Sequence, residues 1–291
     1  MRETHGGVLS LQTAMLTTVA MLAFAANSLL CRFALQRRHI DPVSFAAIRI
    51  VSGAIMLAVI VRLRPERSSP SHADWLAATM LFAYVVFFSF AYITLSAGTG
   101  ALILFGAVQL TMLGAGLRSG EKFGYVAWLG LLLAIAGLFY LVSPGITAPP
   151  LLGAALMAFA GVAWGVYSLR GRGLTDPLAA TAGNFAKAAL LAPLLSLLFI
   201  VNAHAYADAA GVALGIASGA LTSGIGYVIW YAALSRLPAM RAATVQLSVP
   251  LIAAFGGVVF LSETITPRLT AASAAILGGI AMVMTSRSKK R

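Results

Sequence analysis

Long apolar stretches alternate with short polar segments along the 291-residue chain. A helix needs about 20 consecutive apolar residues to cross the hydrocarbon core of a bilayer. Ten windows of suitable length predict spanning helices near 11–33, 43–61, 75–95, 100–117, 123–142, 151–169, 177–201, 209–235, 242–262 and 269–285. The first window is itself long enough to span, so we interpret it as a mature helix and not as a removable signal.

Composition supports the same fold class. Hydrophobic residues make up 60% of the chain and charged residues only 10%, whereas a soluble domain has about 25% charged residues. A soluble core of this length cannot bury so much apolar surface, so the lipid bilayer is the expected partner. The single cysteine, Cys31, excludes an intramolecular disulfide framework and a cysteine-rich metal site.

The basic residues indicate orientation and argue against nucleic-acid binding. The net charge is +12, but the basic residues lie in short clusters between apolar stretches, and no soluble basic domain is present. With a cytoplasmic N-terminus, 14 of the 20 Lys and Arg residues fall on the cytoplasmic side. The opposite side carries Arg32, Arg37, Arg38 and Arg268. The positive-inside rule therefore predicts a multi-pass protein of a bacterial inner membrane with both termini in the cytoplasm.

The two halves of the chain resemble each other. Matching positions are Tyr92, Leu95 and Ser96 with Tyr231, Leu234 and Ser235; Asp41-Pro42 with Asp176-Pro177; Ser119 and Glu121 with Ser262 and Glu263; and Gly137 with Gly279. This order predicts a first five-helix repeat at 1–143, a linker at 144–150 and a second repeat at 151–291. Because five is odd, the second repeat enters the membrane from the opposite side, which makes the duplication inverted.

Only two ionisable residues fall clearly within the predicted spans, Arg49 and Lys187. They either attract a substrate carboxylate or play a structural role, Arg49 by bonding backbone carbonyls and Lys187 by reaching water. All eight carboxylates lie in loops or at helix ends, and no histidine lies within a span. We therefore expect no proton relay through a central carboxylate, no catalytic residues, no metal and no cofactor. A capping or salt-bridging role is expected for Glu121 and Glu263.

Neutral polar and aromatic residues are the candidates for binding a solute. The amides Asn27, Gln109, Asn184 and Gln246 lie inside spans, as interhelical contacts or as solute ligands. Tyr84, Phe88 and Tyr92 share one helix face, and Trp164 with Tyr167 form a second aromatic cluster. Tyr227, Trp230 and Tyr231 form a third, for which an interfacial belt is the favoured interpretation over a cavity wall.

Glycine and proline predict close packing and bends. Gly211, Gly215 and Gly219 form a small-residue ridge that lets two helices approach closely. Pro250 frees backbone groups within the ninth span and marks a bend, and we expect Pro250 and Gly256 to act as hinges.

This pattern resembles the EamA-type family of the drug/metabolite transporter superfamily. The resemblance rests on ten helices in two fives, on Arg49 after Asp41-Pro42, on the stretch 246–251 ending at Ser262-Glu263, and on the glycine of each closing helix. The first repeat departs from the family by having Ala107-Val108-Gln109 where a proline is expected, which leaves the bend of its fourth helix open.

Within the family, the chain is similar to the YddG-type exporters of amino acids. The resemblance implies a central cavity formed largely by the first, third, fourth, sixth, eighth and ninth helices. The candidate substrate-binding residues are Asn27, Tyr84, Phe88, Gln109, Trp164, Tyr167 and Gln246.

The sequence hypothesis is a secondary transporter, not an enzyme. It would export small metabolites, amino acids including aromatic ones, by alternating access, and the working hypothesis for its assembly is a monomer. One alternative is an exporter of drugs or cationic compounds, which aromatic clusters also suit. An alternative of another class is a membrane assembly or scaffold protein, which would have no internal polar cavity.

Overall fold

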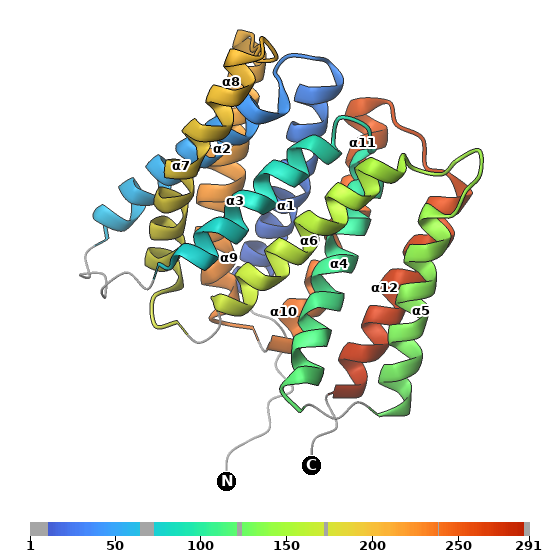
Figure 1. The fold of residues 1–291 in the computed structure, drawn as a ribbon. Helices are drawn as coiled ribbons and strands as arrows, with labels where there is room; N and C mark the ends of the chain where they lie inside the picture. Colours follow the sequence, from blue (N-terminus) through green and yellow to red (C-terminus); the bar gives the residue numbers. More distant parts are fainter. Residues whose placement is uncertain (1–10, 65–72, 121–123, 172–173, 238, 288–291) are drawn as a thin grey trace.

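The computed structural model describes residues 11–64, 73–120, 124–171, 174–237 and 239–287 (Figure 1). The described first half contains α1 (Leu11–Gln36), α2 (Pro42–Arg62), α3 (Trp75–Ala91), α4 (Ala97–Arg118) and α5 (Tyr125–Val142). The second half contains α6 (Leu151–Arg170), α7 (Pro177–Val201), α8 (Ala209–Ile216), the π-helix η1 (Ala217–Ile225), α9 (Gly226–Leu234), α10 (Ala239–Gln246), α11 (Val249–Leu261) and α12 (Pro267–Arg287).

The described helices form the ten predicted spans. Nine of the spans are long and apolar enough to cross a membrane, and α3 is a shorter apolar helix of 17 residues. The elements α8, η1 and α9 run on as one span, Ala209–Leu234, and Thr244–Leu261 combines the end of α10 with α11. The prediction of an all-α protein with ten spanning helices is confirmed.

Four aspartates fix where helices begin. The carboxylate of Asp41 accepts hydrogen bonds from the N–H groups of Val43 and Ser44 at the start of α2. Asp74, Asp176 and Asp208 each accept from the N–H three residues further on and so cap α3, α7 and α8. Such caps satisfy backbone donors that the first helical turn leaves unpaired. The two Asp-Pro pairs of the sequence therefore mark equivalent helix starts in the two halves.

The two halves pack against each other through equivalent helices. The first helix of the second half, α6, contacts α3 and α4 of the first half. The first helix of the first half, α1, contacts α8, η1, α9 and α11 of the second half. The pairs α2 with α7 and α5 with α12 join counterparts directly, and α5 and α12 stand side by side at one edge of the bundle (Figure 1). This exchange of partners is the arrangement expected of an inverted five-helix duplication, and it confirms the predicted fold.

Glycines allow the closest helix crossings. At the α5–α12 pair, a Cβ added to Gly279 would lie 2.7 Å from the backbone nitrogen of Ala134. Gly215 and Gly219 face α2, and Gly211 faces His39 and Ile40 just before that helix, as the predicted ridge requires. The backbone of η1 therefore reaches that of α2 beside Arg49 and Ser52.

Proline separates α10 from α11, whereas α4 runs unbroken. The ninth span breaks at Leu247 and Ser248, directly before Pro250, whose missing N–H cannot continue the helical hydrogen bonds. The equivalent α4 lacks that proline and stays helical from Ala97 to Arg118. At the position that the sequence left open, α4 therefore continues without a break. Gly256 lies inside α11, against the side chain of Leu29.

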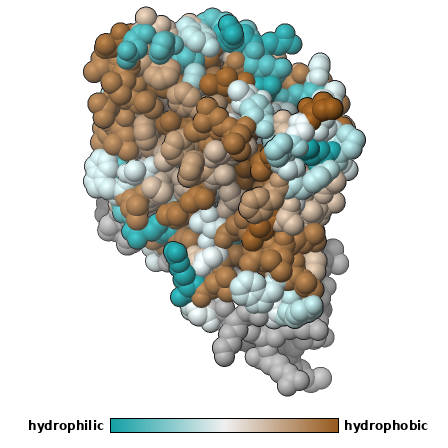
Figure 2. Space-filling view, turned by 45° about the vertical axis from the view of Figure 1, so that its right-hand side comes forward, coloured by the Kyte–Doolittle hydropathy of each residue, from teal (hydrophilic) through white to brown (hydrophobic). Residues whose placement is uncertain are grey.

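The outer surface of the bundle is apolar. Leu194 on α7, Phe139 on α5 and Phe260 on α11 are each at least 70% exposed. Figure 2 shows hydrophobic residues across the middle of the visible face and hydrophilic residues gathered near its upper end. A surface of this kind is stable only against lipid, because water would not solvate it.

Candidate functional site: a central cavity open at one end

A cavity of about 530 Å³ lies between the two halves. At the face where α1 begins and α12 ends, it is lined by Asp74, Arg170 and Leu234, from the start of α3 and the ends of α6 and α9. It extends inward to Ser28 on α1 and Phe88 on α3. We call the first end the open end and the opposite end the closed end. A mostly apolar cavity between helices that also presents a few polar groups is a typical ligand site of bundle proteins.

Aromatic rings form much of the cavity wall. Trp164 on α6 stacks on Tyr227 on α9 with ring centroids 5.6 Å apart, and its centroid is 4.9 Å from that of Tyr84 on α3. Phe24 on α1 meets Trp230 edge-on at 5.8 Å. The favoured sequence interpretation of Tyr227, Trp230 and Tyr231 as an interfacial belt is wrong, because all three line the cavity. Sequence alone does not show which face of an apolar helix meets lipid.

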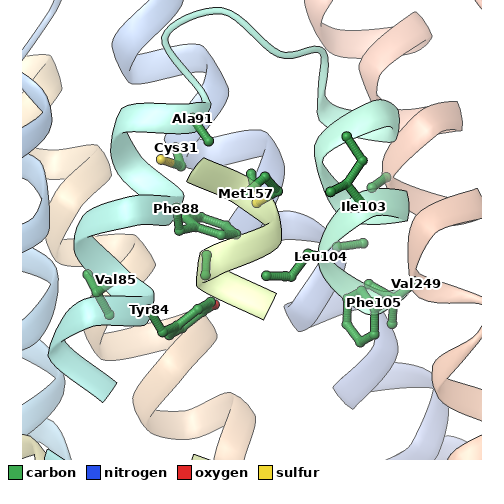
Figure 3. Packing of buried hydrophobic residues seen from close by; sticks show 14 of the residues in the cluster. Cys31, Tyr84, Val85, Phe88, Ala91, Ile103, Leu104, Phe105, Met157 and Val249 are labelled. Atoms are coloured by element: carbon green, nitrogen blue, oxygen red, sulfur yellow. The ribbon is translucent and has the colours of Figure 1, made fainter. Parts of the chain in front are cut away.

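Six of the seven candidate substrate-binding residues line this cavity. These are Asn27, Tyr84, Phe88, Trp164, Tyr167 and Gln246. Gln109 is buried but is not among the lining residues, because its neighbours Val108 and Met112 occupy the inward face of α4 and successive helix positions turn by about 100°. Figure 3 shows Tyr84 and Phe88 projecting from α3 toward the centre, with Leu104 and Phe105 of α4 across from them. Whether any of them binds a substrate stays a prediction.

Polar side chains from both halves meet near the closed end of the cavity. Asn27 accepts hydrogen bonds from Ser218 at 2.6 Å and Thr222 at 3.3 Å, both on η1. Its amide Nδ2 donates to the hydroxyl of Tyr84 at 3.4 Å. The predicted role of Asn27 as an interhelical contact is therefore observed, and the same residue lines the cavity. Ser218 and Thr222 were missed from the sequence because hydroxyls within apolar stretches are common.

The two intramembrane cations have different surroundings. Arg49 is fully buried, and its Nη2 donates to the Tyr84 hydroxyl at 3.0 Å. Lys187 donates from Nζ to the carbonyl of Ala73 at 2.7 Å and lies 5.4 Å from the ring centroid of Trp75. Lys187 therefore ties α7 to the start of α3, which is a structural role. Arg49 bonds side chains, and the backbone carbonyls expected from the sequence are not among its recorded partners in the described chain.

Glu263 lies beyond the closed end of the cavity, where it joins the end of α11 to α1 and α4. Its Oε1 accepts from Nε of Arg32 on α1 at 3.1 Å, and its Oε2 accepts from the backbone N–H of Ala97 at the start of α4. Arg32 also donates to the carbonyls of Tyr92 and Ile93, where α3 ends, both at 3.0 Å. Side chains of this pair are little exposed, at 13% and 11%. The expected capping and salt-bridging role of Glu263 is confirmed, and Glu121 lies outside the described residues.

Two ion pairs lie at the open end, and one of them, Asp74 with Arg170, lines the cavity. Asp74 at the start of α3 pairs with Arg170 at the end of α6 at 2.8 Å, and Arg64 pairs with Asp176 at 3.2 Å. Partial desolvation acts to raise the pKa of Asp74, but the backbone N–H of Ala77 and the guanidinium of Arg170 together hold this pKa below its ordinary value. The sequence analysis did not identify Asp74 and Arg170 as site residues, because both lie at the ends of predicted helices, where charged residues are common.

The repeated motif of the two halves has opposite exposure at the two ends. Leu95 is 1% exposed at the closed end, and its counterpart Leu234 is 37% exposed at the open end. Likewise Tyr92 is fully buried, and its counterpart Tyr231 lines the open cavity. The same sequence motif is therefore buried at the closed end in the first half and accessible at the open end in the second half.

Backbone and side-chain contacts join the halves at the closed face as well. Asp41 Oδ2 accepts from the N–H of Tyr206 at 3.0 Å, and Ile40 forms an antiparallel bridge with Ala207. His39 Nδ1 lies 2.8 Å from Asp208 Oδ2. The N–H of Gly211 and then His39 lower the pKa of Asp208. These contacts mirror those of Asp176 and Asp74 at the open face.

Comparison with known proteins agrees with this architecture. The model of the EamA-like transporter family matches residues 11–143 and again residues 151–285. The chain belongs to this family. An uncharacterized protein of Pseudomonas aeruginosa is 53% identical over 276 residues, which cover 95% of this chain and 96% of that protein.

Further relatives of this EamA-like transporter carry transport names. The threonine/homoserine exporter RhtA of Escherichia coli K12 is 29% identical over 172 residues, 57% of each chain. An uncharacterized transporter of Archaeoglobus fulgidus is 24% identical over 86% of this chain and 91% of its own. A solved crystal structure superposes with a TM-score of 0.66 at 20% identity, over 96% of this chain and 99% of its own, and so supports the fold. The protein is a multi-span membrane transporter of a family found in bacteria.

The described residues hold no group of three or more His, Cys, Asp or Glu side chains that could bind a metal ion. The family and the relatives' names indicate a transporter rather than an enzyme. The predicted hinge residues Pro250 and Gly256 are placed at a helix break and in a tight helix contact, respectively. Their role as hinges stays a prediction.

Proposed function

We propose that this EamA-like transporter is a secondary carrier that exports small metabolites, namely amino acids including aromatic ones, from the bacterial cytoplasm by alternating access. The observation that carries the proposal is the cavity between the halves, polar and aromatic inside, open at one end and closed at the other. A scaffold protein would have no use for such an internal polar chamber. The printed names of its relatives support amino-acid export without fixing the substrate.

Alternating access follows from exchange of roles between the repeats. We propose that the units 1–143 and 151–291, joined by the linker 144–150, adopt each other's conformations during the cycle. The opposite exposure of Leu95 and Leu234 supports this, since the same motif is compatible with both settings. In this proposal both termini are cytoplasmic, so the structure represents the inward-open state.

Transport in proteoliposomes tests the proposed function. Vesicles loaded with unlabelled threonine, homoserine or phenylalanine should take up the same amino acid, supplied outside with a label, by saturable counterflow. Trp164→Ala removes a ring that contacts both Tyr84 and Tyr227 and should reduce the flux about tenfold. The matched control Trp128→Phe alters a half-exposed ring of α5 outside the cavity and should leave the flux unchanged.

The same experiment separates the alternatives. Saturable flux of quaternary amines with none for any amino acid would favour the exporter of cationic compounds, to which the aromatic wall is also suited. No saturable flux of either class would contradict the carrier and leave the scaffold.

A further inference from the structure

Arg49 is held without a counter-ion at the closed end of the cavity. Its guanidinium carbon lies 5.1 Å from the ring centroid of Tyr84 and 4.9 Å from that of Phe88. Nη2 bonds the Tyr84 hydroxyl and Nε approaches Ser223 Oγ at 3.4 Å, but Nη1 has no hydrogen-bond partner within the described chain. A fully buried donor of this kind is costly unless something else satisfies it.

The carboxylates of the described chain do not supply that partner. Glu263 is bound to Arg32 and Ala97, and Asp41 accepts three backbone N–H groups. Asp74, Asp176 and Asp208 cap helices and pair with Arg170, Arg64 and His39 at the two faces. A buried cation inside a bilayer costs several kcal/mol unless an anion or strong dipoles balance it. The aromatic faces of Tyr84 and Phe88 supply only part of that balance.

The cavity reaches this cation through Tyr84. Tyr84, Phe88, Ser223 and Asn27 line the cavity, and Arg49 lies directly behind them. The Tyr84 hydroxyl accepts from both Arg49 and Asn27, which uses both of its lone pairs. The hydroxyl proton of Tyr84 therefore remains to be donated, and it can be donated to an acceptor that binds in the cavity.

We propose that this end of the cavity is a carboxylate subsite. Tyr84 donates a hydrogen bond to the carboxylate of the substrate, and Arg49 acts as the positioning residue whose charge favours the anion and polarises the Tyr84 hydroxyl. A rotation of Tyr84 gives Nη1 direct access to the same carboxylate. The inference rests on the proposed carrier function and narrows its substrates to small molecules that carry a carboxylate.

The remainder of the cavity suits the rest of an amino acid. An ammonium group a few ångströms from the carboxylate would lie among the rings of Trp164 and Tyr227, whose faces attract cations. An amine without a carboxylate would be repelled by the positive charge of Arg49, because it brings no negative charge to balance it. The subsite thus selects against purely cationic compounds, which the aromatic wall alone does not.

The test compares acids with their amides. Threonine and phenylalanine are measured beside threoninamide and phenylalaninamide, both by counterflow and by stabilisation of the detergent-purified protein against heat. The wild type should prefer each acid over its amide by about tenfold, as expected for a charge-assisted hydrogen bond. Arg49→Gln and Tyr84→Phe should lower the affinity for the acids to that for the amides and leave the amides unchanged.

Three further variants control for charge and folding. Arg49→Lys keeps the positive charge and should retain a preference for the acid at reduced affinity. Arg37→Gln removes an exposed arginine between α1 and α2, outside the cavity lining, and Tyr125→Phe removes an exposed hydroxyl of α5, so neither should alter the preference. If Arg49→Gln does not fold, Tyr84→Phe, which keeps the ring packing, decides alone.

The outcomes distinguish the subsite from the carrier. Equal transport of acid and amide by the wild type, or an equal loss of both in folded Arg49→Gln, would overturn the subsite and leave the carrier. Stabilisation by acids without flux would overturn the carrier and keep the subsite. Neither flux nor stabilisation with any of the four probes would overturn both.

Discussion

At the scale of single residues, the surroundings of a charged side chain depend on its depth within the helix bundle. The carboxylates of the described chain sit at helix ends, where backbone N–H groups and basic side chains bind them. Arg49 alone is fully buried among the described charged residues of the spans, and it contacts rings and hydroxyls. The closed end of the cavity therefore carries the positive charge of Arg49, whereas the open end carries both an acidic and a basic side chain, Asp74 and Arg170.

The ion pair of Asp74 with Arg170 at the open end should not respond to pH in the physiological range. Because the pKa of Asp74 is lowered, its pairing contributes fully above the ordinary Asp pKa of about 3.9 and is lost only as pH falls through the still lower folded-state pKa. Asp74→Asn keeps a helix-capping side chain and removes the charge. Its flux should therefore have the same pH profile between about pH 5 and 8 as the wild type. An inflection in that range that vanishes in Asp74→Asn would contradict the assignment.

At the scale of helices, glycine contacts decide which spans touch. Gly278 and Gly279 are neighbours on α12, but an added Cβ would meet nothing within 4 Å at Gly278 and the backbone of α5 at Gly279. Gly279→Ala should therefore force α5 and α12 apart and lower the stability by about 1–3 kcal/mol. Gly278→Ala is the matched control and should leave the stability unchanged or slightly higher. Thermal unfolding in detergent compares them, and equal midpoints would refute the close crossing.

The helices could be predicted from sequence much better than the site. Length and hydropathy are local properties, so the ten spans, the Asp-Pro helix starts and the glycine ridge followed directly, although the partner of the ridge did not. Lipid and a neighbouring helix are both apolar, so hydropathy does not show which face turns inward. That is why Trp230 was assigned to the surface and Gln109 to the cavity, each against the structure. The partners of Arg49 come from distant segments, and no spacing in the sequence reveals them.

At the scale of the whole molecule, the inverted halves predict a second state. Exchange of their conformations should bury Leu234 and expose Leu95, the reverse of the present exposures. The variants Leu95→Cys and Leu234→Cys, made in a Cys31→Ala background, allow labelling with a thiol reagent. Conditions that increase labelling at one position should decrease it at the other. Parallel changes at both positions would show that the two ends do not alternate.

The Arg32–Glu263 pair should control that exchange. Glu263→Gln keeps an acceptor for Ala97 but weakens the little-exposed pair, so the closed end should open more often. Labelling of Leu95→Cys should then be several-fold faster, since a buried hydrogen bond to a charged group contributes about 1.5–3 kcal/mol. Arg64→Gln weakens an exposed pair at the other face and should not change this rate. An unchanged rate in Glu263→Gln would place control of opening elsewhere.

The π-helix η1 has a consequence for how the two halves diverged. Its wider turns occupy Ala217–Ile225, whereas the counterpart α3 is a regular α-helix. Segments of this type correspond to one extra residue in an α-helix, and η1 is where Ser218, Thr222 and Ser223 reach Asn27 and Arg49. Deleting one residue of η1 would restore the regular winding and turn the hydroxyls beyond the deletion by about 100°. The wider winding of η1 is thus a difference between the two halves that sets where the hydroxyls of Ser218, Thr222 and Ser223 stand relative to α1 and α2.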